Sequence, residues 1–263
     1  MQIISSKDNE IVKNIKKLKE KKYRDLENKF IVEGIKLVEE AIQENADIKQ
    51  IVVCDDDVQE GNLSKEYMYK IAKYDCIYVT AKVFQVLSDV KTPQGILAVI
   101  EKKNTNTTLD FSQDIIIALD DIQDPGNLGT ILRTVDSAGL NQIILSKNSA
   151  DAFNPKVVRS TMGAIFRVNI IIAENLEEML KQAQKNKFEI MVTSLDTQNS
   201  IYDIKYKNKV IVIGNEANGV SKPIQDMADK KVKIPMLGKT ESLNASVATS
   251  IMIYEYVRGK IVK

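Results

Sequence analysis

The stretch KVIVIGNEANG, residues 209–219, joins a continuous apolar run to a turn rich in glycine and asparagine. A run that is apolar at successive positions predicts a strand covered on both faces, as in a parallel sheet flanked by helices. Glycine directly after such a strand lets the backbone approach a flat ligand closely. The stretch therefore predicts an α/β domain with a ligand site at the end of a strand.

The same pattern recurs through the C-terminal half of the chain. Further strand candidates, separated by helical segments, are IIIAL (115–119), QIIL (142–145), VNIII (168–172) and EIMVT (189–193). Strands that alternate with helices in this way predict a doubly wound domain with a parallel sheet. We expect this domain to span residues 111–263.

The N-terminal half predicts a second, smaller domain. Its short apolar runs alternate with helical patterns and are FIV (30–32), IVVC (51–54), CIYV (76–79) and ILAVI (96–100). This alternation predicts a small α/β domain over residues 1–103. Residues 104–110 are polar and lack apolar periodicity, so they predict a linker between the two domains.

Composition excludes several classes of function. The chain has no histidine, which excludes a Ser-His-Asp hydrolase, a histidine general base and the common histidine-containing zinc sites, and we expect no metal site. The two cysteines, Cys54 and Cys76, form no CxxC pair and predict reduced thiols. No basic-then-apolar leader follows Met1, and the apolar runs are too short to span a membrane. We therefore expect a cytoplasmic protein that does not bind membranes.

A net charge of +1 conceals a basic N-terminus, where residues 1–30 contain nine cations and five acids. A single helix is predicted from about residue 7 to residue 26, with Ile11, Ile15 and Leu18 on one stripe. Its lysines have two interpretations: an ordinary solvated face, or a surface that attracts RNA phosphates.

Two more turn-forming patches accompany the first. DDIQDPGNLGTILR (120–133) places a Pro-Gly-Asn turn before an amphipathic helix, and IPMLGKTESLNASVA (234–248) places serines and asparagines before another. Each patch alone is compatible with an ordinary helix cap or βα turn. GNLG also lacks the ending of a P-loop and the spacing of a dinucleotide fingerprint.

Together and in this order, the three patches resemble the motifs of the SpoU family of RNA ribose 2′-O-methyltransferases, within the SPOUT superfamily. The matching segments are NLGTILR (127–133), IGNEANG (213–219) and IPMLGKTESLNASVA (234–248). The resemblance extends to the family's substrate-binding domain, to its junction and to a segment that faces RNA. The matching segments are FIVEG (30–34), SDVKTPQGILAV (88–99) and NPKVVRSTMGA (154–164). The resemblance thus covers essentially the whole chain.

The resemblance implies a fold, a cofactor and a reaction. It implies a C-terminal domain tied in a trefoil knot, S-adenosylmethionine as the cofactor, and a homodimer formed through that domain. The implied reaction is methyl transfer to a ribose 2′-OH of structured RNA. Ribosomal RNA is the favoured substrate, tRNA is the alternative, and a catalytically silent RNA-binding protein of ribosome assembly is the rival from another class.

The resemblance also assigns residues. The implied catalytic residues are Asn127, Arg133, Glu216, Ser242 and Asn244. The implied cofactor-binding residues are Thr193, Leu195, Gly214, Glu216, Gly219, Ile234, Met236, Leu243 and Ala248. The expected RNA-binding residues are Lys16, Lys17, Lys21, Lys22, Arg24, Arg159 and Arg167.

Arg133 has two possible roles. Within the family this arginine is proposed as the base that removes the 2′-OH proton. A guanidinium with a pKa above roughly 12 is a poor proton acceptor, so the alternative is a clamp on phosphate or on developing negative charge.

Overall fold

The computed structural model describes residues 3–103 and 108–262 of the chain. The chain divides into two compact units, which we call the N-terminal unit (Met1–Asn104 and Phe153–Phe166) and the C-terminal unit (Thr105–Ala152 and Arg167–Lys263). Part of the predicted linker, residues 104–107, lies outside the described residues. Residues 153–166, which the sequence places in the second domain, group with the first.

The N-terminal unit is built on a mixed sheet. Its described strands follow the order β1-β4-β3-β5-β2, in which β5 runs antiparallel to both β3 and β2. The strands are β1 (Ile3–Ile4), β2 (Lys29–Glu33), β3 (Ile48–Cys54), β4 (Cys76–Val79) and β5 (Ile96–Glu101). The helices are α1 (Glu10–Lys17), α2 (Lys21–Glu27), α3 (Ile35–Gln43), α4 (Asp55–Gln59), α5 (Lys65–Ile71), α6 (Ala81–Leu87), α8 (Pro155–Ser160) and the 3-10 turn η1 (Ala164–Phe166).

The predicted N-terminal helix is wrong in one respect, because the segment forms two helices. Helix α1 ends at Lys17, and α2 begins at Lys21. The buried stripe of α1 contains Val12 and Ile15, whereas Ile11 is 40% exposed. Spacing alone could not separate Ile11 from Val12, because both are apolar and adjacent.

The C-terminal unit has the predicted parallel sheet. Its strand order is β11-β9-β10-β6-β7-β8, and every described pairing is parallel. The strands are β6 (Ile115–Asp120), β7 (Gln142–Ser146), β8 (Asn169–Ala173), β9 (Glu189–Thr193), β10 (Lys209–Gly214) and β11 (Lys230–Val232). The helices are α7 (Pro125–Ser137), α9 (Leu176–Lys185), α10 (Lys222–Met227), α11 (Ala245–Ile261) and the 3-10 turn η2 (Ile201–Asp203).

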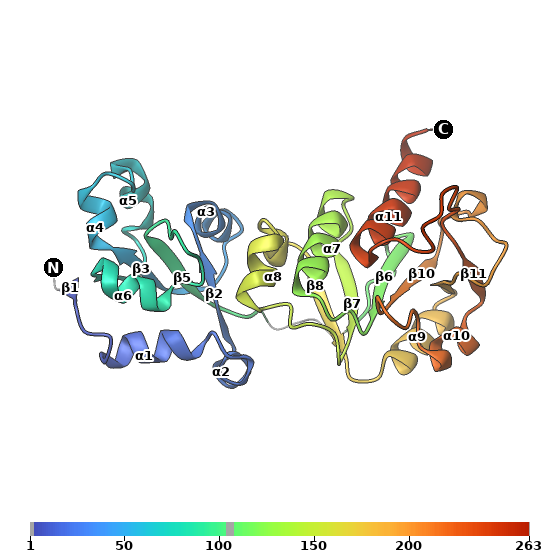
Figure 1. Ribbon diagram of the computed structural model, residues 1–263, viewed down its shortest axis with the longest axis horizontal. Helices are drawn as coiled ribbons and strands as arrows, with labels where there is room; N and C mark the ends of the chain where they lie inside the picture. The colour runs from blue at the N-terminus through green and yellow to red at the C-terminus, as the bar shows by residue number, and fades with distance from the viewer. Residues whose placement is uncertain (1–2, 104–107, 263) are drawn as a thin grey trace. The chain divides into compact units, whose positions relative to one another are not determined.

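Helices cover both faces of this sheet, as the apolar runs predict. Figure 1 shows α7 and α11 on one side of the sheet and α9 and α10 on the other. Alternate residues of β6 point to opposite faces of the sheet. Ile116 and Ala118 pack in the core on the α9 face, together with the fully buried Leu180 of α9. All of β6 is buried, since each face carries a layer of helices.

The strand predictions from apolar runs are confirmed, with two omissions. The sequence missed β1 and β11, which are two and three residues long. Both lie at sheet edges, where few side chains are buried and the apolar signal is weak. No helix in the described part of the chain is long and apolar enough to cross a membrane.

Candidate active site

The predicted site residues come from loops at the carboxyl ends of neighbouring parallel strands. Asp120 ends β6 and pairs in register with Gly214, which ends β10, and Thr193 at the end of β9 pairs with Val232 of β11. In an open parallel sheet, this edge is where ligands bind. The sheet order therefore brings together three patches that are far apart in the sequence.

A chain of hydrogen bonds joins those patches. The Asn127 amide donates from Nδ2 to Glu216 Oε1 at 2.8 Å, and its Oδ1 accepts from Asn244 Nδ2 at 3.0 Å. Asn244 Oδ1 in turn accepts from the backbone N of Ser246 at 2.9 Å and from its hydroxyl at 2.7 Å. We call Glu216, Asn127, Asn244 and Ser246 the polar cluster.

Helix caps explain two positions in this cluster. Asp124 is the N-cap of α7 and accepts the backbone N–H of Asn127 at 2.8 Å, with Pro125 in the first turn. Asn244 is the N-cap of α11. Both asparagines thus sit at helix N-termini, where free backbone N–H groups favour negative charge such as that of Glu216.

The loop that carries Glu216 closes on itself. Asn215 and Gly219 exchange two backbone hydrogen bonds, of 3.0 and 2.8 Å. A Cβ added to Gly214 would lie 2.0 Å from the backbone of Gly219 and Val220, so only glycine fits at Gly214. Gly219 itself has a φ of +67°, a conformation that favours glycine.

The side chain of Asn215 ties this loop to the neighbouring strand, and the resemblance did not assign it. Its Oδ1 accepts the backbone N–H of Ala217 at 2.9 Å, and its Nδ2 donates to the carbonyl of Asp121 at 2.9 Å. The Asp121 carboxylate accepts the Ser146 hydroxyl at 2.6 Å. The sequence signal that could have identified Asn215 is an asparagine directly after an apolar strand, because its short side-chain amide can hydrogen-bond the backbone of its own turn.

Two of the five predicted catalytic residues lie apart from this hydrogen-bond chain. The side chain of Arg133 is exposed on α7 and makes no hydrogen bond or ion pair with any described residue. Ser242 is exposed in the loop before α11, likewise without a hydrogen bond to the described residues. Asn127, Glu216 and Asn244 are therefore the predicted catalytic residues that the structure joins by hydrogen bonds.

The predicted cofactor residues share the same sheet edge. Thr193 and Gly214 end β9 and β10. Ile234, Met236 and Leu243 follow β11 in the loop that leads to α11, and Ala248 lies in the first turn of that helix. Leu195 follows β9 and is 66% exposed. The structure thus places these residues at or after the ends of three adjacent strands and at the start of α11.

These loops leave main chain and an apolar side chain exposed at the sheet edge. A Cβ added to Gly219 or to Gly238 would meet no atom within 4 Å, so the main chain there faces open space. Leu237 is fully exposed on the loop after β11, which offers apolar surface.

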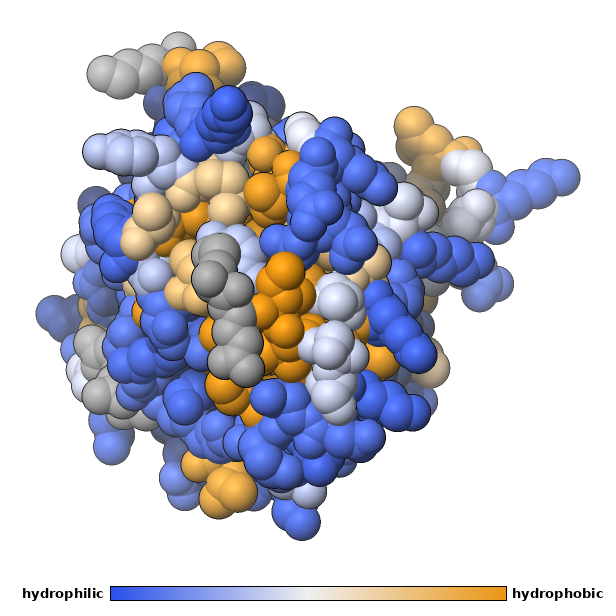
Figure 2. Space-filling model, turned by 90° about the vertical axis from the view of Figure 1, so that its left-hand side faces the viewer, coloured by the Kyte–Doolittle hydropathy of each residue, from blue (hydrophilic) through white to orange (hydrophobic). Residues whose placement is uncertain are grey.

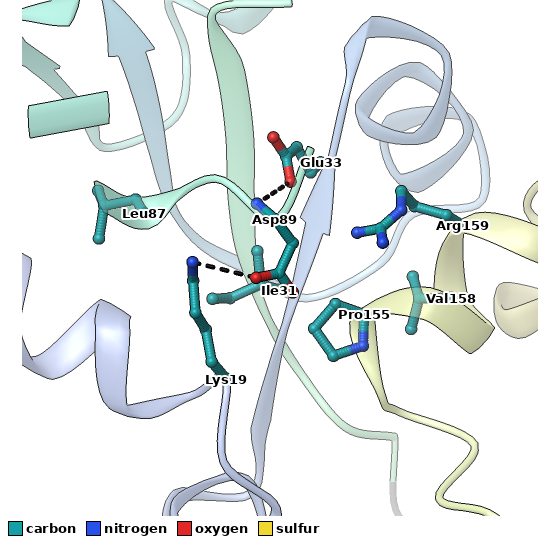
Figure 3. Close-up of a pocket in the computed structure, with 8 residues that line it drawn as sticks. All are labelled: Lys19, Ile31, Glu33, Leu87, Asp89, Pro155, Val158 and Arg159. Atoms are coloured by element: carbon teal, nitrogen blue, oxygen red, sulfur yellow. Dashed lines mark hydrogen bonds and ion pairs between the residues drawn. The ribbon is translucent and has the colours of Figure 1, made fainter. Parts of the chain in front are cut away.

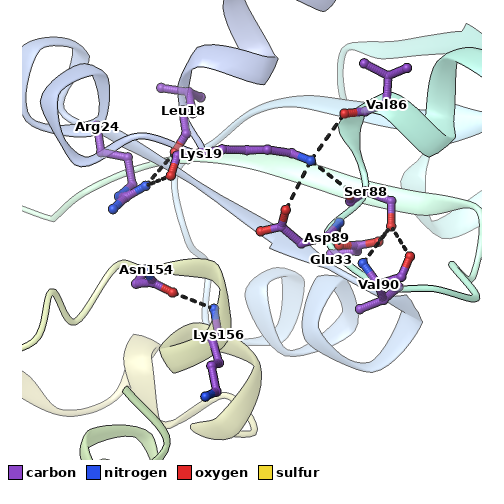
Figure 4. A network of polar contacts seen from close by, with 10 residues as sticks. All are labelled: Leu18, Lys19, Arg24, Glu33, Val86, Ser88, Asp89, Val90, Asn154 and Lys156. Atoms are coloured by element: carbon purple, nitrogen blue, oxygen red, sulfur yellow. Dashed lines mark hydrogen bonds and ion pairs between the residues drawn. The ribbon is translucent and has the colours of Figure 1, made fainter. Parts of the chain in front are cut away.

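Arg24 is a correction to the expected RNA-binding residues. Its side chain is 2% exposed, and Nη1 donates to the carbonyls of Leu18 at 2.8 Å and Lys19 at 2.7 Å (Figure 4). The guanidinium therefore satisfies the carbonyls at the end of α1 and is not available to an RNA phosphate.

The other N-terminal cations remain candidates for RNA binding. The lysines of the set are all exposed, and they are Lys16, Lys17, Lys21 and Lys22. The Nζ atoms of Lys17 and Lys22 each lie 5.8 Å from the ring centroid of Tyr23. The face shown in Figure 2 is largely hydrophilic, with an apolar area near its centre.

The two remaining arginines belong to different units. Arg167, in the C-terminal unit, bonds Asp136 through Nη2 at 3.0 Å. Arg159, on α8 in the N-terminal unit, lines a pocket with Lys19, Glu33 and Asp89 (Figure 3).

Comparison with known families agrees with this architecture. The model of the SpoU rRNA Methylase family matches residues 114–254, which contain the whole polar cluster. The model of the MRM3-like substrate binding domain matches residues 9–98, which lie in the N-terminal unit.

Relatives match over the full length of the chain. The 23S rRNA (guanosine(2553)-2'-O)-methyltransferase RlmP of Bacillus subtilis (strain 168) is 32% identical, over 98% of this chain and 100% of the relative. An AdoMet-bound rRNA methyltransferase from Sinorhizobium meliloti superposes with a TM-score of 0.86 at 32% identity, over 100% of this chain and 99% of that one. An RNA 2'-O ribose methyltransferase superposes with a TM-score of 0.84 at 27% identity, over 99% and 100%. From its three ordered patches, its parallel sheet and these full-length matches, the chain belongs to the SpoU rRNA methylase family.

Proposed function

We propose that this protein transfers the methyl group of S-adenosylmethionine to a ribose 2′-OH of structured RNA, with ribosomal RNA as the substrate class. The observation that carries the proposal is the polar cluster, in which Asn127 joins Glu216 to Asn244 across three loops. The relatives support the substrate class, because the full-length relative from Bacillus subtilis is named for 23S rRNA.

The cofactor would be held by the loops after β9, β10 and β11. Glycine at 214 and 219 allows the main chain to approach it, and Leu195 and Leu243 supply apolar contacts. S-adenosylmethionine supplies a methyl carbon bonded to a positively charged sulfur, which leaves with the bonding electrons. The task of the protein is then to align the ribose oxygen with that carbon–sulfur bond.

The polar cluster supplies this alignment. Glu216 Oε1 is held by Asn127, whereas Oε2 has no hydrogen-bond partner among the described residues and can accept the 2′-OH of the ribose. Asn127 is itself fixed by Asn244, so the carboxylate is oriented before the substrate arrives. Arg133 then acts either as the proton acceptor or as a clamp on the adjacent phosphate.

The N-terminal unit would bind the RNA around the target nucleotide. Its match to a substrate binding domain and the exposed lysines of α1 and α2 support this role. Lysines attract phosphates without reading sequence, so they would contribute affinity, and the site loops would select the ribose.

We also propose a homodimer formed through the C-terminal unit, with its chain tied in a trefoil knot. Exposed apolar side chains on α11, among them Val247 and Tyr254, support such an interface. Light scattering after size-exclusion chromatography tests the dimer, and a mass near 29.5 kDa, that of one chain, would contradict it.

The methyl-transfer proposal is tested with purified protein, methyl-labelled S-adenosylmethionine, and ribosomal RNA or tRNA made without modifications. Mass spectrometry of the digested RNA should detect a 2′-O-methylated nucleoside in ribosomal RNA. Asn127→Ala should abolish it while the protein still folds. Cofactor binding without methylation of either RNA would instead favour a silent RNA-binding protein.

A further inference from the structure

The loop that carries Glu216 is held at both of its ends by two consecutive residues, Asp120 and Asp121, where β6 ends. The carboxylate of Asp120 accepts the backbone N–H of Ser221 through Oδ2 at 2.7 Å. The carbonyl of Asp121 accepts Nδ2 of Asn215 at 2.9 Å. The position of the whole loop therefore depends on where the end of β6 places these two acceptors.

Asp121 has a backbone conformation that few residues other than glycine adopt. Its φ is +59°, in the left-handed region, where a residue with a Cβ is sterically strained. Such a conformation persists only where the surrounding structure fixes it. Because the Asp121 carbonyl belongs to the same backbone, whatever fixes this conformation also fixes the acceptor of Asn215.

Ser146 supplies that restraint from a different strand. It is the buried last residue of β7, and its hydroxyl accepts the backbone N–H of Asp121 at 2.8 Å and donates to Asp121 Oδ1 at 2.6 Å. A hydroxyl has one donor and two acceptor positions, and the hydroxyl of Ser149 lies 3.1 Å from the remaining one. A single atom, Ser146 Oγ, thus holds both the backbone and the carboxylate of Asp121.

Asn215 carries the restraint to Glu216. Its side-chain Oδ1 accepts the backbone N–H groups of Ala217 at 2.9 Å and Asn218 at 3.2 Å. Asn215 and Ala217 flank Glu216 in the chain, so one amide side chain fixes the main chain on both sides of it. The exposed Glu216 side chain receives a hydrogen bond only from Asn127 among the described residues. The direction of its carboxylate therefore depends on how its main chain is held.

We propose that Ser146 and Asp121 are positioning residues for Glu216 in methyl transfer, an inference that rests on the proposed function. The path runs from Ser146 Oγ to Asp121, from the Asp121 carbonyl to Asn215, and from Asn215 to the main chain beside Glu216. Strand β7 contributes no residue to the three motifs or to the polar cluster. The path therefore extends the site to a strand outside them.

Cutting this path should slow methyl transfer and spare cofactor binding. The backbone hydrogen bonds between Asn215 and Gly219 close the loop without Asp121, so the glycines proposed to face the cofactor stay in place. Glu216 would lose its orientation toward the ribose oxygen, and a misplacement of about 1 Å can slow an oriented reaction by about 100-fold. We therefore expect slower chemistry at unchanged affinity for S-adenosylmethionine.

The test measures the single-turnover rate of methyl transfer by the full chain, with protein and methyl-labelled S-adenosylmethionine in excess over unmodified ribosomal RNA. Ser146→Ala and Asn215→Ala should each lower this rate by about ten-fold or more. The dissociation constant of S-adenosylmethionine, from calorimetry, should change by less than about two-fold. The double variant should be no slower than the slower single variant, because residues that act through one path are not additive.

Two further variants separate positioning from a loss of stability. Asn141→Ala is the matched control, because it removes a side-chain amide bonded to a carboxylate, Asp110 Oδ2 at 2.9 Å, just before the amino end of β7. It should keep the wild-type rate, whatever stability urea denaturation gives it. Asp121→Asn should also retain most of the rate, because asparagine keeps an oxygen acceptor for Ser146 and tolerates the left-handed conformation.

Four results would overturn the proposal. A wild-type rate in Ser146→Ala would remove this hydroxyl from the reaction. Losses that multiply in the double variant would mean that Ser146 and Asn215 act independently. A loss of cofactor affinity as large as the loss of rate would assign both residues to the cofactor site. In these three cases the proposed function stands, whereas a wild-type protein that methylates neither ribosomal RNA nor tRNA would contradict that function itself.

Replacement variants keep the comparison intact if an alanine variant fails to fold. Ser146→Cys has a weaker donor and acceptor, and Asn215→Ser has a shorter side chain. Each takes the place of the corresponding alanine variant, with the same expected losses of rate and the same limit on the change in cofactor affinity.

Discussion

Substituting Gly214 by alanine tests the loop on which the proposed cofactor site depends. The added Cβ would lie 2.0 Å from the carbonyl carbon of Gly219 and from the backbone nitrogen of Val220. Both neighbours are main chain, so no side chain can rotate away. Ordinary contact begins at 3.4 Å, and the backbone of 219–220 must therefore move by about 1.4 Å.

That movement is large enough to break the loop. The two backbone hydrogen bonds between Asn215 and Gly219, of 3.0 and 2.8 Å, would lengthen beyond 4 Å. Each contributes about 0.5–1.5 kcal/mol, so the native loop loses about 1–3 kcal/mol. If S-adenosylmethionine binds only the native loop, its affinity should fall by about 5- to 150-fold.

The assay is isothermal titration calorimetry with S-adenosylmethionine, accompanied by urea denaturation. Gly259→Ala is the matched control, because a Cβ there meets no atom within 4 Å and Gly259 lies inside α11. Alanine in a helix should stabilise this control by up to about 1 kcal/mol without changing its affinity for the cofactor.

The reasoning would be refuted by a folded Gly214→Ala protein with wild-type affinity for S-adenosylmethionine. The loop after β10 would then not hold the cofactor. An equal loss of affinity in Gly259→Ala would also refute it, because the effect would not come from the loop.

Three further perturbations follow from the structure. Arg133→Ala should leave folding and cofactor affinity nearly intact, because the side chain is exposed, and should lower methyl transfer by a factor of about 100 or more. In Arg133→Lys, activity that recovers at high pH identifies a base, whereas a partial recovery that does not depend on pH identifies a clamp. Wild-type turnover of Arg133→Ala would remove the residue from the mechanism. Replacing four exposed lysines with glutamine should weaken RNA binding and flatten its dependence on salt; these are Lys16, Lys17, Lys21 and Lys22. An unchanged dependence of RNA affinity on salt would mean that these lysines of α1 and α2 form an ordinary solvated face. Hydrogen bonds from Arg258, the shorter of them 2.6 Å long, lower the pKa of Glu255 in the folded protein. The carboxylate therefore stabilises the fold at pH values above its unfolded pKa of roughly 4.3. This contribution is lost as the pH falls through the folded pKa. Urea denaturation should therefore show Glu255→Gln less stable than wild type at pH 7, and a difference that did not shrink as the pH falls below the unfolded pKa would contradict this.

The sequence by itself determined the class of fold and the family. Continuous apolar runs such as IIIAL (115–119) and KVIVIG (209–214) predict strands buried on both faces, because only helices on each side of a sheet can cover them. The order of the three turn patches carries the family resemblance. These are local patterns, and local backbone preference is enough to interpret them.

Only the tertiary structure decided which polar groups meet. Asn127 and Glu216 are 89 residues apart, and Asn127 and Asn244 are 117 apart, so no local pattern pairs them. The sequence could not separate buried Arg24 from the exposed lysines beside it, because its partners are carbonyls exposed by the end of α1. Likewise, the burial of Arg159 Nη1, which has no hydrogen-bond partner among the described residues, could not be predicted locally, because α8 packs beside β2 although the two are more than a hundred residues apart. Burial and hydrogen-bond partners are set by contacts between distant elements, whereas a sequence pattern reports only the conformation of its own segment.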